Sequence, residues 1–340
     1  MRIELPISKA IANRLLILQA IHGDGLMTVS CDMPDDVRIM SEAIRRLGER
    51  REARIDLGNC GSAMRFLTAY CAQLEGQTTI LDGVERMHHR PIGQLVDALR
   101  EIGADIEYLG EEGFPPLRIK GCILNKHKIV TINNPLSTQF VSALLLIGAN
   151  VQTDSTSPYI YITQEVIKQY QLSPFSFHLS VEKDWSSAAF WYEYVALYGG
   201  EITLPGLSRD SLQGDKIVAD IFAHLGIYTT YTAEGVVISS SPLHPTPYTL
   251  HHDFVACPDL YPAIALTCER LGVELHATGV ESLPLKESDR LRAVREHRTD
   301  ADHRMAMALL IAGYEVDDTA CISKSYPNFI EHFRHINSLK

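Results

Sequence analysis

The hydrophobic pattern of the chain repeats one unit of helix, strand, turn and strand. In its clearest copy, residues 96–121, apolar positions at helical spacing end at Gly103, and two alternating strand patterns follow, separated by a turn at Gly113. A second copy covers residues 218–239, and weaker copies end at Gly48, near Gln171 and at Gly272. Repeats of roughly 45–60 residues predict an architecture assembled from one supersecondary module.

The repeat is shortened in three places, near residues 49–54, 150–156 and 295–301. After the helical patterns that end at Gly48 and in LRAVREHR, the module predicts a strand, a turn and a second strand, but the sequence has almost no residues for them. Either these loops are short in the native protein or residues are missing from the sequence, and the sequence alone leaves both alternatives open.

Six predicted helices begin with polar or charged residues, three in each half of the chain. The first begins in the stretch PISKAIANR, where Lys9 and Arg14 lie within the first turns of an apolar helical pattern. A helix N-terminus carries a partial positive charge, so two cations there are unfavourable unless they bind an anion. The other five helices begin near Asn59, Ser137, Asp184, Asp259 and Asp302.

Each of these helix starts is ordinary by itself, because Ser, Thr, Asp and Asn cap helices in most proteins. Around residues 59–62, for example, Asn59, Gly61 and Ser62 predict a loop and a cap. Together the six starts indicate more. Free N–H groups at a helix start, joined by a Lys or Arg, bind phosphate or carboxylate groups. We therefore expect the helix starts to converge on a cleft for anionic molecules.

The densest group of charges is LPLKESDRLRAV, residues 283–294. Lys286 and Arg290 would share one face if this stretch is helical. The residues alone slightly favour a solvated helix with ion pairs over an anion site here. Two more candidate cations are Arg90, in a turn before a helix, and Lys324, ahead of a turn that contains proline.

The composition limits the partners of such a cleft. A net charge of −11 argues against nucleic acid or an anionic membrane, so we expect small molecules. No apolar run approaches the ~20 residues of a membrane-spanning helix. The 7 cysteines are scattered and form no C-x-x-C pair, which suits a reducing compartment. No signal peptide is recognisable, and we expect a cytoplasmic protein.

Several motifs with established chemistry are absent from the sequence. It contains no G-x-x-x-x-G-K-[ST], no dinucleotide-binding G-x-G-x-x-G and no H-E-x-x-H. The adjacent pairs His88-His89 and His251-His252 would be splayed apart by strand or loop geometry, so neither predicts a metal site. We expect no cofactor and no metal.

A series of short motifs lies along the chain in this order: KAIANR (9–14), NCGSAMR (59–65), RP (90–91), STQ (137–139), VEKDWSS (181–187), SLQGD (211–215), PD (258–259), KESDR (286–290), DHRMAM (302–307) and SKSYP (323–327). Each motif is short, but their combination and order are specific. In these motifs the chain resembles the EPSP synthase (3-phosphoshikimate 1-carboxyvinyltransferase) family of enolpyruvyl transferases, from residue 5 to the C-terminus.

The resemblance implies an α/β fold, a two-domain inside-out α/β barrel with three repeated βαβαββ-type modules in each domain. The N-terminal lobe would be residues 8–179, and the C-terminal lobe residues 1–7 plus 180–340. The two lobes would meet at a hinge near Pro6 and Val181 and close around the substrates. This organisation agrees with the repeats found independently in the hydrophobic pattern.

The implied activity is a transferase reaction of the shikimate pathway, which leads to chorismate and the aromatic amino acids. The enolpyruvyl group of phosphoenolpyruvate moves to the 5-hydroxyl of shikimate 3-phosphate, and inorganic phosphate is released. The reaction needs a carboxylate near the hydroxyl, an acid near C3 of phosphoenolpyruvate, and cations that hold two phosphates and a carboxylate. The resemblance also implies a monomer, and makes the phosphoenolpyruvate site a target of glyphosate.

The resemblance assigns site residues by position. Asp259 is the candidate base at the 5-hydroxyl, and Glu287 with Lys9 is the candidate proton relay at C3. The phosphoenolpyruvate-binding residues would be Lys9, Asn59, Gly61, Arg65, Arg90, Gln139, Lys286, Arg290, Arg304 and Lys324. The shikimate 3-phosphate-binding residues would be Lys9, Arg14, Ser137, Thr138, Gln139, Tyr159, Asp259, Ser282 and Lys286.

Two departures from the family pattern lie beside Lys9. Ala10 replaces a serine that contacts the shikimate phosphate, and Ile7 replaces a glycine, so weaker binding of shikimate 3-phosphate is expected. These departures keep open a non-catalytic binder of phosphorylated metabolites on the same fold. UDP-N-acetylglucosamine enolpyruvyl transferase is a further alternative, but it lacks the SLQGD and SKSYP elements. The retained carboxylates Asp259 and Glu287 favour an enzyme, because simple phosphate capture does not need them.

Overall fold

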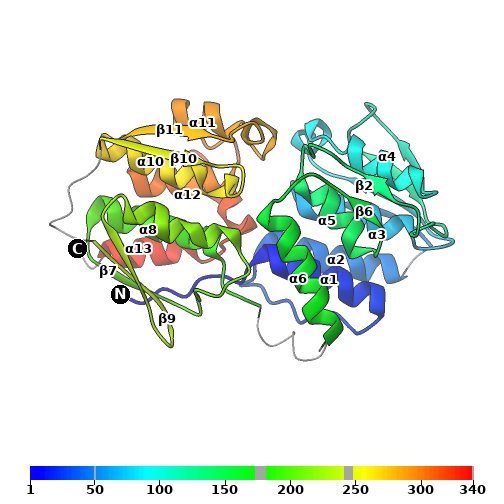
Figure 1. The fold of residues 1–340 in the computed structure, drawn as a ribbon, viewed down its shortest axis with the longest axis horizontal. Coiled ribbons are helices and arrows are strands. Elements are labelled where there is room, and N and C mark those ends of the chain that lie inside the picture. The colour runs from blue at the N-terminus through cyan, green and yellow to red at the C-terminus, as the bar shows by residue number, and fades with distance from the viewer. Residues whose placement is uncertain (50, 173–180, 241–247, 339–340) are drawn as a thin grey trace. The chain divides into compact units, whose positions relative to one another are not determined.

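The computed structural model describes residues 1–49, 51–172, 181–240 and 248–338. The chain forms two compact units, which we describe separately (Figure 1). The N-terminal unit contains Lys9–Cys31 and Asp36–Val181. The C-terminal unit contains Met1–Ser8, Asp32–Asp35 and Glu182–Lys340. The hinge predicted near Pro6 and Val181 concerns the motion of the two lobes, and it stays a prediction.

The helices and strands of the N-terminal unit follow the predicted module. In chain order they are α1 (Lys9–His22), α2 (Asp35–Glu49), β1 (Glu52–Asp56), α3 (Gly61–Ala72), β2 (Thr78–Asp82), the 3-10 helix η1 (Glu85–His89), α4 (Gly93–Glu101), β3 (Asp105–Tyr108), β4 (Leu117–Lys120), β5 (Val130–Thr131), α5 (Thr138–Leu146), β6 (Val151–Gln152) and α6 (Pro158–Leu172).

One module of this unit is complete and forms a four-stranded sheet in the order β1-β2-β4-β3. β1 and β2 are parallel, whereas β4 is antiparallel to both β2 and β3. The predicted glycine positions are confirmed here. Gly103 follows α4 with a φ of 103°, and Gly113 lies between β3 and β4 with a φ of 88°. Glycine adopts this left-handed backbone without the clash that a Cβ atom would cause.

The C-terminal unit repeats the pattern. Its elements are α8 (Trp185–Tyr198), β7 (Glu201–Pro205), η2 (Gly214–Ile217), α9 (Val218–Ala223), β8 (Ile227–Tyr231), β9 (Gly235–Ser240), β10 (Thr249–Asp253), η3 (Pro258–Leu260), α10 (Tyr261–Leu271), β11 (Glu274–Thr278), η4 (Leu283–Leu285), α11 (Arg290–Glu296), α12 (His303–Ala312), η5 (Ala320–Lys324) and α13 (Phe329–Ser338).

The first residues of the chain belong to this unit by backbone pairing. Arg2 forms a parallel bridge with Thr203 of β7, and the N–H of Ser8 donates to the carbonyl of Glu182 at 2.7 Å. β7, β9 and β8 form an antiparallel sheet in that order, while β10 and β11 form a separate parallel pair.

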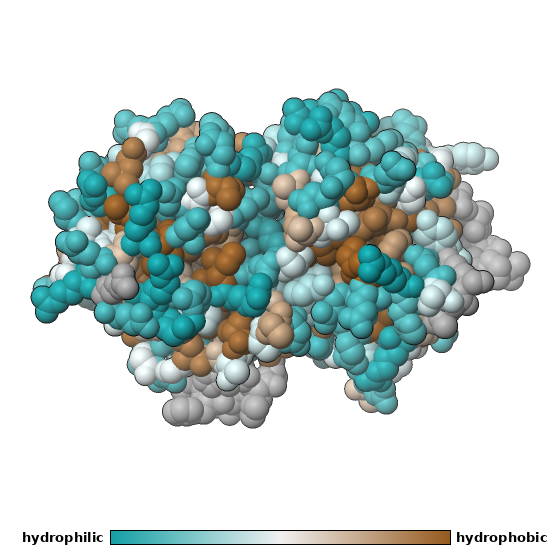
Figure 2. Space-filling model, turned by 180° about the vertical axis from the view of Figure 1, so that it is seen from behind, coloured by the Kyte–Doolittle hydropathy of each residue, from teal (hydrophilic) through white to brown (hydrophobic). Residues whose placement is uncertain are grey.

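In both units the helices form the interior and the strands lie outside them, as predicted. Nearly every residue of α3 and α12 is buried, because these helices are apolar on all sides rather than on one stripe. The described strands form separate sheets and no closed barrel. The face shown in Figure 2 is largely hydrophilic, with hydrophobic side chains in scattered patches.

Glu193 of α8 is an acidic side chain within the apolar core of the C-terminal unit. It is fully buried, and neither of its carboxyl oxygens has a hydrogen-bond partner among the described residues. Burial without compensation disfavours the charged form, so the pKa of Glu193 is raised well above its ordinary value of 4.5. At pH values between the ordinary and the raised pKa, Glu193 therefore keeps its proton in the folded chain and loses it in the unfolded chain. The stability of this unit should fall as the pH rises from that ordinary value through the raised pKa.

We predict that Glu193→Met stabilises the C-terminal unit by about 1–3 kcal/mol at about pH 8, because it removes an unsatisfied buried polar group. The gain should be smaller at about pH 5, where protonation of Glu193 costs less. Urea unfolding at both pH values measures the effect. The exposed Glu201→Met in β7 is the control. An equal gain at both pH values would contradict the raised pKa.

Candidate active site

A network of buried charges lies at the starts of η3, α11 and α12 in the C-terminal unit. Its centre is Arg290, whose side chain is 1% exposed. Arg290 donates from Nη1 to Asp259 Oδ1 at 2.8 Å, from Nε to Asp302 Oδ2 at 2.8 Å, and from Nη2 to Glu287 Oε2 at 3.2 Å. One guanidinium therefore holds three carboxylates from different segments.

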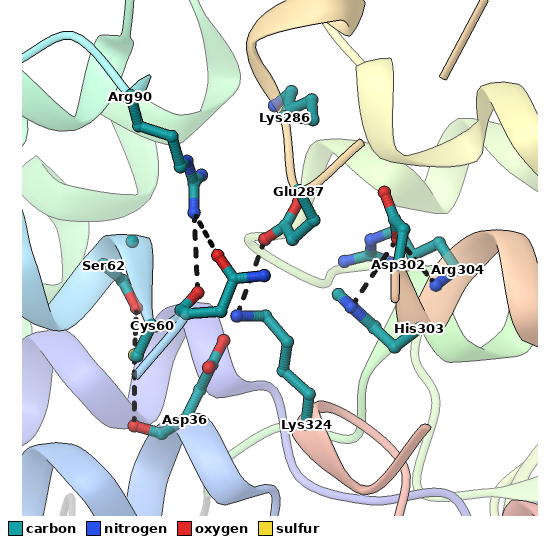
Figure 3. Close-up of polar contacts among 12 residues, drawn as sticks. Asp36, Cys60, Ser62, Arg90, Lys286, Glu287, Asp302, His303, Arg304 and Lys324 are labelled. Atoms are coloured by element: carbon teal, nitrogen blue, oxygen red, sulfur yellow. Dashed lines mark hydrogen bonds and ion pairs between the residues drawn. The ribbon is translucent and has the colours of Figure 1, made fainter. Parts of the chain in front are cut away.

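Three further cations surround these carboxylates. Arg304 Nη2 donates to Asp259 Oδ2 at 2.9 Å, and Lys286 Nζ lies 3.7 Å from Asp259 Oδ1. Lys324 Nζ lies 3.7 Å from Glu287 Oε1, an ion pair drawn in Figure 3. With Arg290, four cations face these three carboxylates, and the charges of Asp184 and Asp215 also act on Arg304.

These contacts set the protonation of Asp259. Burial opposes its ionisation, but the charges of Arg304, Lys286 and Arg290 outweigh burial and hold the pKa of Asp259 well below its usual range. The carboxylates act on their partner in return. Burial works against the charge of Arg290, but Asp302, Asp259 and Glu287 raise its pKa, so Arg290 stays charged.

Asp302 positions two of the cations, and sequence reasoning identified only its role as a helix cap. It is fully buried, and its Oδ1 accepts from the N–H of Arg304, so it caps α12 as predicted. Its Oδ2 also accepts from Ser288 Oγ at 3.2 Å and from Arg290. The sequence could not reveal this second function, because Arg290 and Asp302 are separated by the loop that follows α11.

The prediction of a solvated helix around Lys286 is wrong. Residues 286–289 are not helical, and α11 begins only at Arg290, with Asp289 as its cap. Lys286 therefore extends from a loop, and Arg290 is buried rather than solvated. Ser282 lies at the start of η4, the short helix that leads to this loop.

A second carboxyl group that sequence reasoning did not assign is Asp215, in the SLQGD motif. It is buried and accepts a hydrogen bond from Ser186 Oγ near the start of α8. Burial and the negative charge of Asp259 raise the pKa of Asp215 to about 6. Asp215 can therefore hold or release a proton near neutral pH. Burial and the charge of Asp259 distinguish Asp215 from an ordinary polar turn residue, and both depend on segments that are distant in sequence.

In the N-terminal unit, Arg65 and Arg90 converge on the start of α3. Arg65 is buried, and its Nη1 donates to the carbonyl of Gly61 at 3.0 Å. Arg90 Nη1 contacts the main-chain and side-chain oxygens of Asn59, both at 3.5 Å (Figure 3). A Cβ atom on Gly61 would lie 2.4 Å from Arg65 Nη1 and 2.7 Å from Arg90 Nη1 and Nη2. Only glycine allows both guanidinium groups this close.

The predicted cap at this helix is wrong. α3 begins at Gly61, its N-cap residue is Cys60, and no side chain caps it. Ser62 lies inside the helix, where its Oγ accepts from Asn13 Nδ2 at 2.9 Å. No side chain therefore caps the first N–H groups of α3, and these N–H groups lie next to the guanidinium groups of Arg65 and Arg90.

Arg14 is buried in the N-terminal unit without a carboxylate partner among the described residues. It donates to Thr163 Oγ1 at 2.7 Å, to Ser142 Oγ at 3.2 Å, and to the carbonyls of Ala10 and Tyr159 at 2.7 and 3.1 Å. Burial lowers the pKa of Arg14 to about 10, because only neutral groups compensate its charge. A buried cation of this kind favours a nearby anion.

The remaining predicted residues lie at helix starts of the same unit. Ser137 caps α5 through the N–H of Gln139, as predicted, with Thr138 as the first helical residue. Lys9 begins α1, and its Nζ lies 2.8 Å from Asp36 Oδ2. Among the described residues, no group of three or more His, Cys, Asp or Glu side chains could hold a metal ion. No helix in the described ranges is long and apolar enough to cross a membrane.

The fold defines a class of two-domain α/β proteins. Two solved structures of EPSP synthase from Acinetobacter baumannii match with TM-scores of 0.68 and 0.66, each covering 98% of this chain and 95% of the matched chain at 18% identity. The sequence model of the EPSP synthase (3-phosphoshikimate 1-carboxyvinyltransferase) family matches residues 1–173, 147–298 and 294–333. The chain belongs to this family of transferases.

Curated relatives support the same membership. A 3-phosphoshikimate 1-carboxyvinyltransferase of Bacteroides fragilis is 37% identical, covering 98% of this chain and 94% of the relative. One from Colwellia psychrerythraea is 29% identical, covering 98% and 96%.

The family match also shows where this chain differs. Its three segments meet within residues 147–173 and 294–298, which overlap two of the shortened repeats. The alignment with the B. fragilis relative spans 394 positions, more than the 340 residues of this chain. The chain therefore lacks internal residues that the relative has.

We predict that Asp302→Asn lowers the free energy of unfolding by about 3 kcal/mol, because it leaves the buried Arg290 partly uncompensated. Asp300→Asn is a matched control two residues away. Asp300 pairs with the largely exposed Arg292 and Arg298, so its loss should cost at most about 1 kcal/mol. Urea unfolding of both variants measures the difference. Equal losses would contradict the central role of Asp302.

Proposed function

We propose that this chain transfers the enolpyruvyl group of phosphoenolpyruvate to the 5-hydroxyl of shikimate 3-phosphate and releases inorganic phosphate. Membership in the 3-phosphoshikimate 1-carboxyvinyltransferase family supports this reaction. The single structural observation that carries the proposal is the network around Arg290, which places four cations in contact with carboxylates from three segments. Anion binding alone explains the cations, whereas proton transfer also requires the carboxylates.

We assign the binding of phosphoenolpyruvate to the guanidinium groups of both units and to Lys286 and Lys324. Arg65 and Arg90 at Gly61, and Arg290 and Arg304 at Asp259, present N–H groups suited to phosphate and carboxylate oxygens. Asn59 and Gln139 would add neutral polar contacts. For shikimate 3-phosphate, the uncompensated charge of Arg14 supports a role for Arg14 with Tyr159, Ser137 and Thr138.

We assign Asp259 to the 5-hydroxyl proton. With three cations around it, Asp259 is a carboxylate at neutral pH, and its low pKa makes it a weak base. Anionic substrates would offset the charges of Arg304, Lys286 and Arg290. The proton affinity of Asp259 would then rise as the substrates bind. This coupling would make Asp259 an effective base only when the site is filled.

We assign Glu287 to proton transfer at C3 of phosphoenolpyruvate, with Lys9 as a second member of the relay. Glu287 is 10% exposed and lies between Lys324 and Arg290, which fix both of its oxygens. Asp36 orients the Lys9 ammonium in the N-terminal unit. Ser282 is assigned to shikimate 3-phosphate through its place before Lys286.

We predict that the chain releases phosphate only when both substrates are present, as measured by a phosphate-release assay. Asp259→Asn and Glu287→Gln should each lower kcat by at least about 100-fold, since they remove proton-transfer groups. Glu281→Gln, an exposed residue before the same loop, is the control and should keep full activity. Calorimetric binding of both substrates without turnover would instead support a non-catalytic binder.

We also predict that Gly61→Ala raises the KM for phosphoenolpyruvate by roughly 10–100-fold, because the methyl group would displace charged contacts of Arg65 and Arg90. The KM for shikimate 3-phosphate should change less. Gly93→Ala, also at the first residue of a helix, is the control, since its Cβ would lie no closer than 3.4 Å to any neighbour. Steady-state kinetics would reject the assignment if both variants behave alike.

A further inference from the structure

The second strand of a complete module is paired on both edges. In the N-terminal unit, β2 pairs in parallel with β1 and antiparallel with β4. In the C-terminal unit, β7 has the same surroundings, with the parallel bridge to Arg2 on one edge and the antiparallel strand β9 on the other. In both modules, the antiparallel partner belongs to the hairpin that follows the next helix.

β11 occupies the same position but has only one partner strand among the residues that the structure describes. It pairs in parallel with β10, and η4 and α11 follow it as η1 and α4 follow β2. Only residues 297–302 separate α11 from α12, too few for two strands and a turn. Three of these residues, His297, Asp300 and Ala301, adopt positive φ values in this tight connection. Among the described residues, β11 therefore has no antiparallel partner.

The open edge of β11 presents unpaired backbone groups. Glu274 donates its N–H to the carbonyl of Tyr248 at 2.9 Å, and Thr278 accepts from the N–H of Phe254 at 2.8 Å. Alternate residues of a parallel strand bond to the same neighbour, so the N–H and C=O groups of Leu275 and Ala277 point to the other edge. Within the described part of the chain, nothing bonds to them.

We propose that β11 is a dimerisation edge, where it pairs antiparallel with β11 of a second copy of this chain. A two-fold axis makes two identical strands antiparallel, which is the orientation that β4 and β9 have in the complete modules. The resulting sheet would have four strands, two from each copy. An unpaired strand edge is a ready template for such pairing.

The charges of β11 select the register. With the axis at Leu275, Glu274 of each copy lies opposite His276 of the other, which gives two pairs that attract when the histidine is protonated. An axis at His276 would place the two histidines opposite each other, and an axis at Ala277 would pair neither charge. Glu274 and His276 are both exposed on one face of the strand, where His276 Nε2 lies 3.4 Å from Glu274 Oε1 and the ring stacks on His251. In the dimer, each Glu274 would exchange this partner for His276 of the other copy.

Hydrogen bonding fits the same register. The two Leu275 residues would exchange both of their N–H···O=C bonds. Ala277 of each copy would donate to the carbonyl of Val273 of the other, whereas the N–H of Val273 is already used by the carbonyl of Cys268. This self-complementarity favours a second copy over an unrelated strand. The dimer goes beyond the proposed function and replaces the monomer that the family resemblance implies.

Analytical ultracentrifugation of the full chain over a wide concentration range tests the proposal. The wild-type chain should form a dimer and no larger species. Ala277→Pro should raise the dimer Kd by at least roughly tenfold, because it removes an N–H from the open edge while a proline at that position leaves the pairing with β10 intact. A chain that stays monomeric, or associates without limit, would overturn the proposal.

A charge exchange tests the register. Glu274→His and His276→Glu, each alone, should raise the dimer Kd by roughly tenfold, since like groups then face each other twice. The double variant with both exchanges should return Kd to near the wild-type value. Glu201→His, an exposed position of β7 in the other sheet of this unit, is the control and should leave Kd unchanged. Thermal unfolding of each variant separates this effect from misfolding. If the double variant fails to restore the dimer, the register is wrong.

Discussion

Burying a guanidinium is costly unless partners inside the protein match its charge and its N–H groups, and in the C-terminal unit Arg290 has such partners on three segments. Its partners come from η3, from the loop before α11 and from the N-cap of α12. The cost of removing Arg290 from water is therefore offset only when all three segments are in place. The same contacts that stabilise the fold here also fix the carboxylates to which we assign the chemistry.

The buried arginines of the N-terminal unit have partners of a different kind. Arg14 is surrounded by hydroxyl and carbonyl oxygens rather than by carboxylates, and Arg65 and Arg90 approach each other across Gly61. Such an arrangement carries a free-energy cost in the absence of an anion, which binding would recover. In the C-terminal unit, the carboxylates lower that cost but compete with the ligand. The charge of Arg14 is thus met only by neutral groups, whereas the charge of Arg290 is compensated by the carboxylates of the protein.

The sequence predicted the local features well, because local interactions determine them. Asp184, Asp302 and Ser137 cap helices as expected, and Gly103 and Gly272 adopt the left-handed backbone after theirs. The repeat of helix, strand, turn and strand was also visible in periodicity alone. These features depend on residues within a few positions of each other.

The features that the sequence did not predict depend on contacts between distant segments. The second role of Asp302 requires Arg290 beside it, and the raised pKa of Asp215 requires both burial and the nearby charge of Asp259. The cap expected near Ser62 is absent because α3 begins one residue earlier, at Gly61, and the Ser62 hydroxyl instead accepts a hydrogen bond from the distant Asn13. Glu193 gave no signal in the sequence, since a single glutamate in an apolar helix usually faces solvent.

The short connection between α11 and α12 lies outside the helical core, and this position explains why the fold of the unit does not depend on the missing hairpin. The core of this unit is formed largely by α8, α10 and α12, which pack against one another, while the strands cover them from outside. Loss of an outer hairpin therefore leaves the helical core intact. The connection ends at Ala301, directly before Asp302, so the cap of α12 and its bond to Arg290 are retained. The shortening thus affects the sheet edge and spares the charged site, because the site is built on the inner helices rather than on the strands.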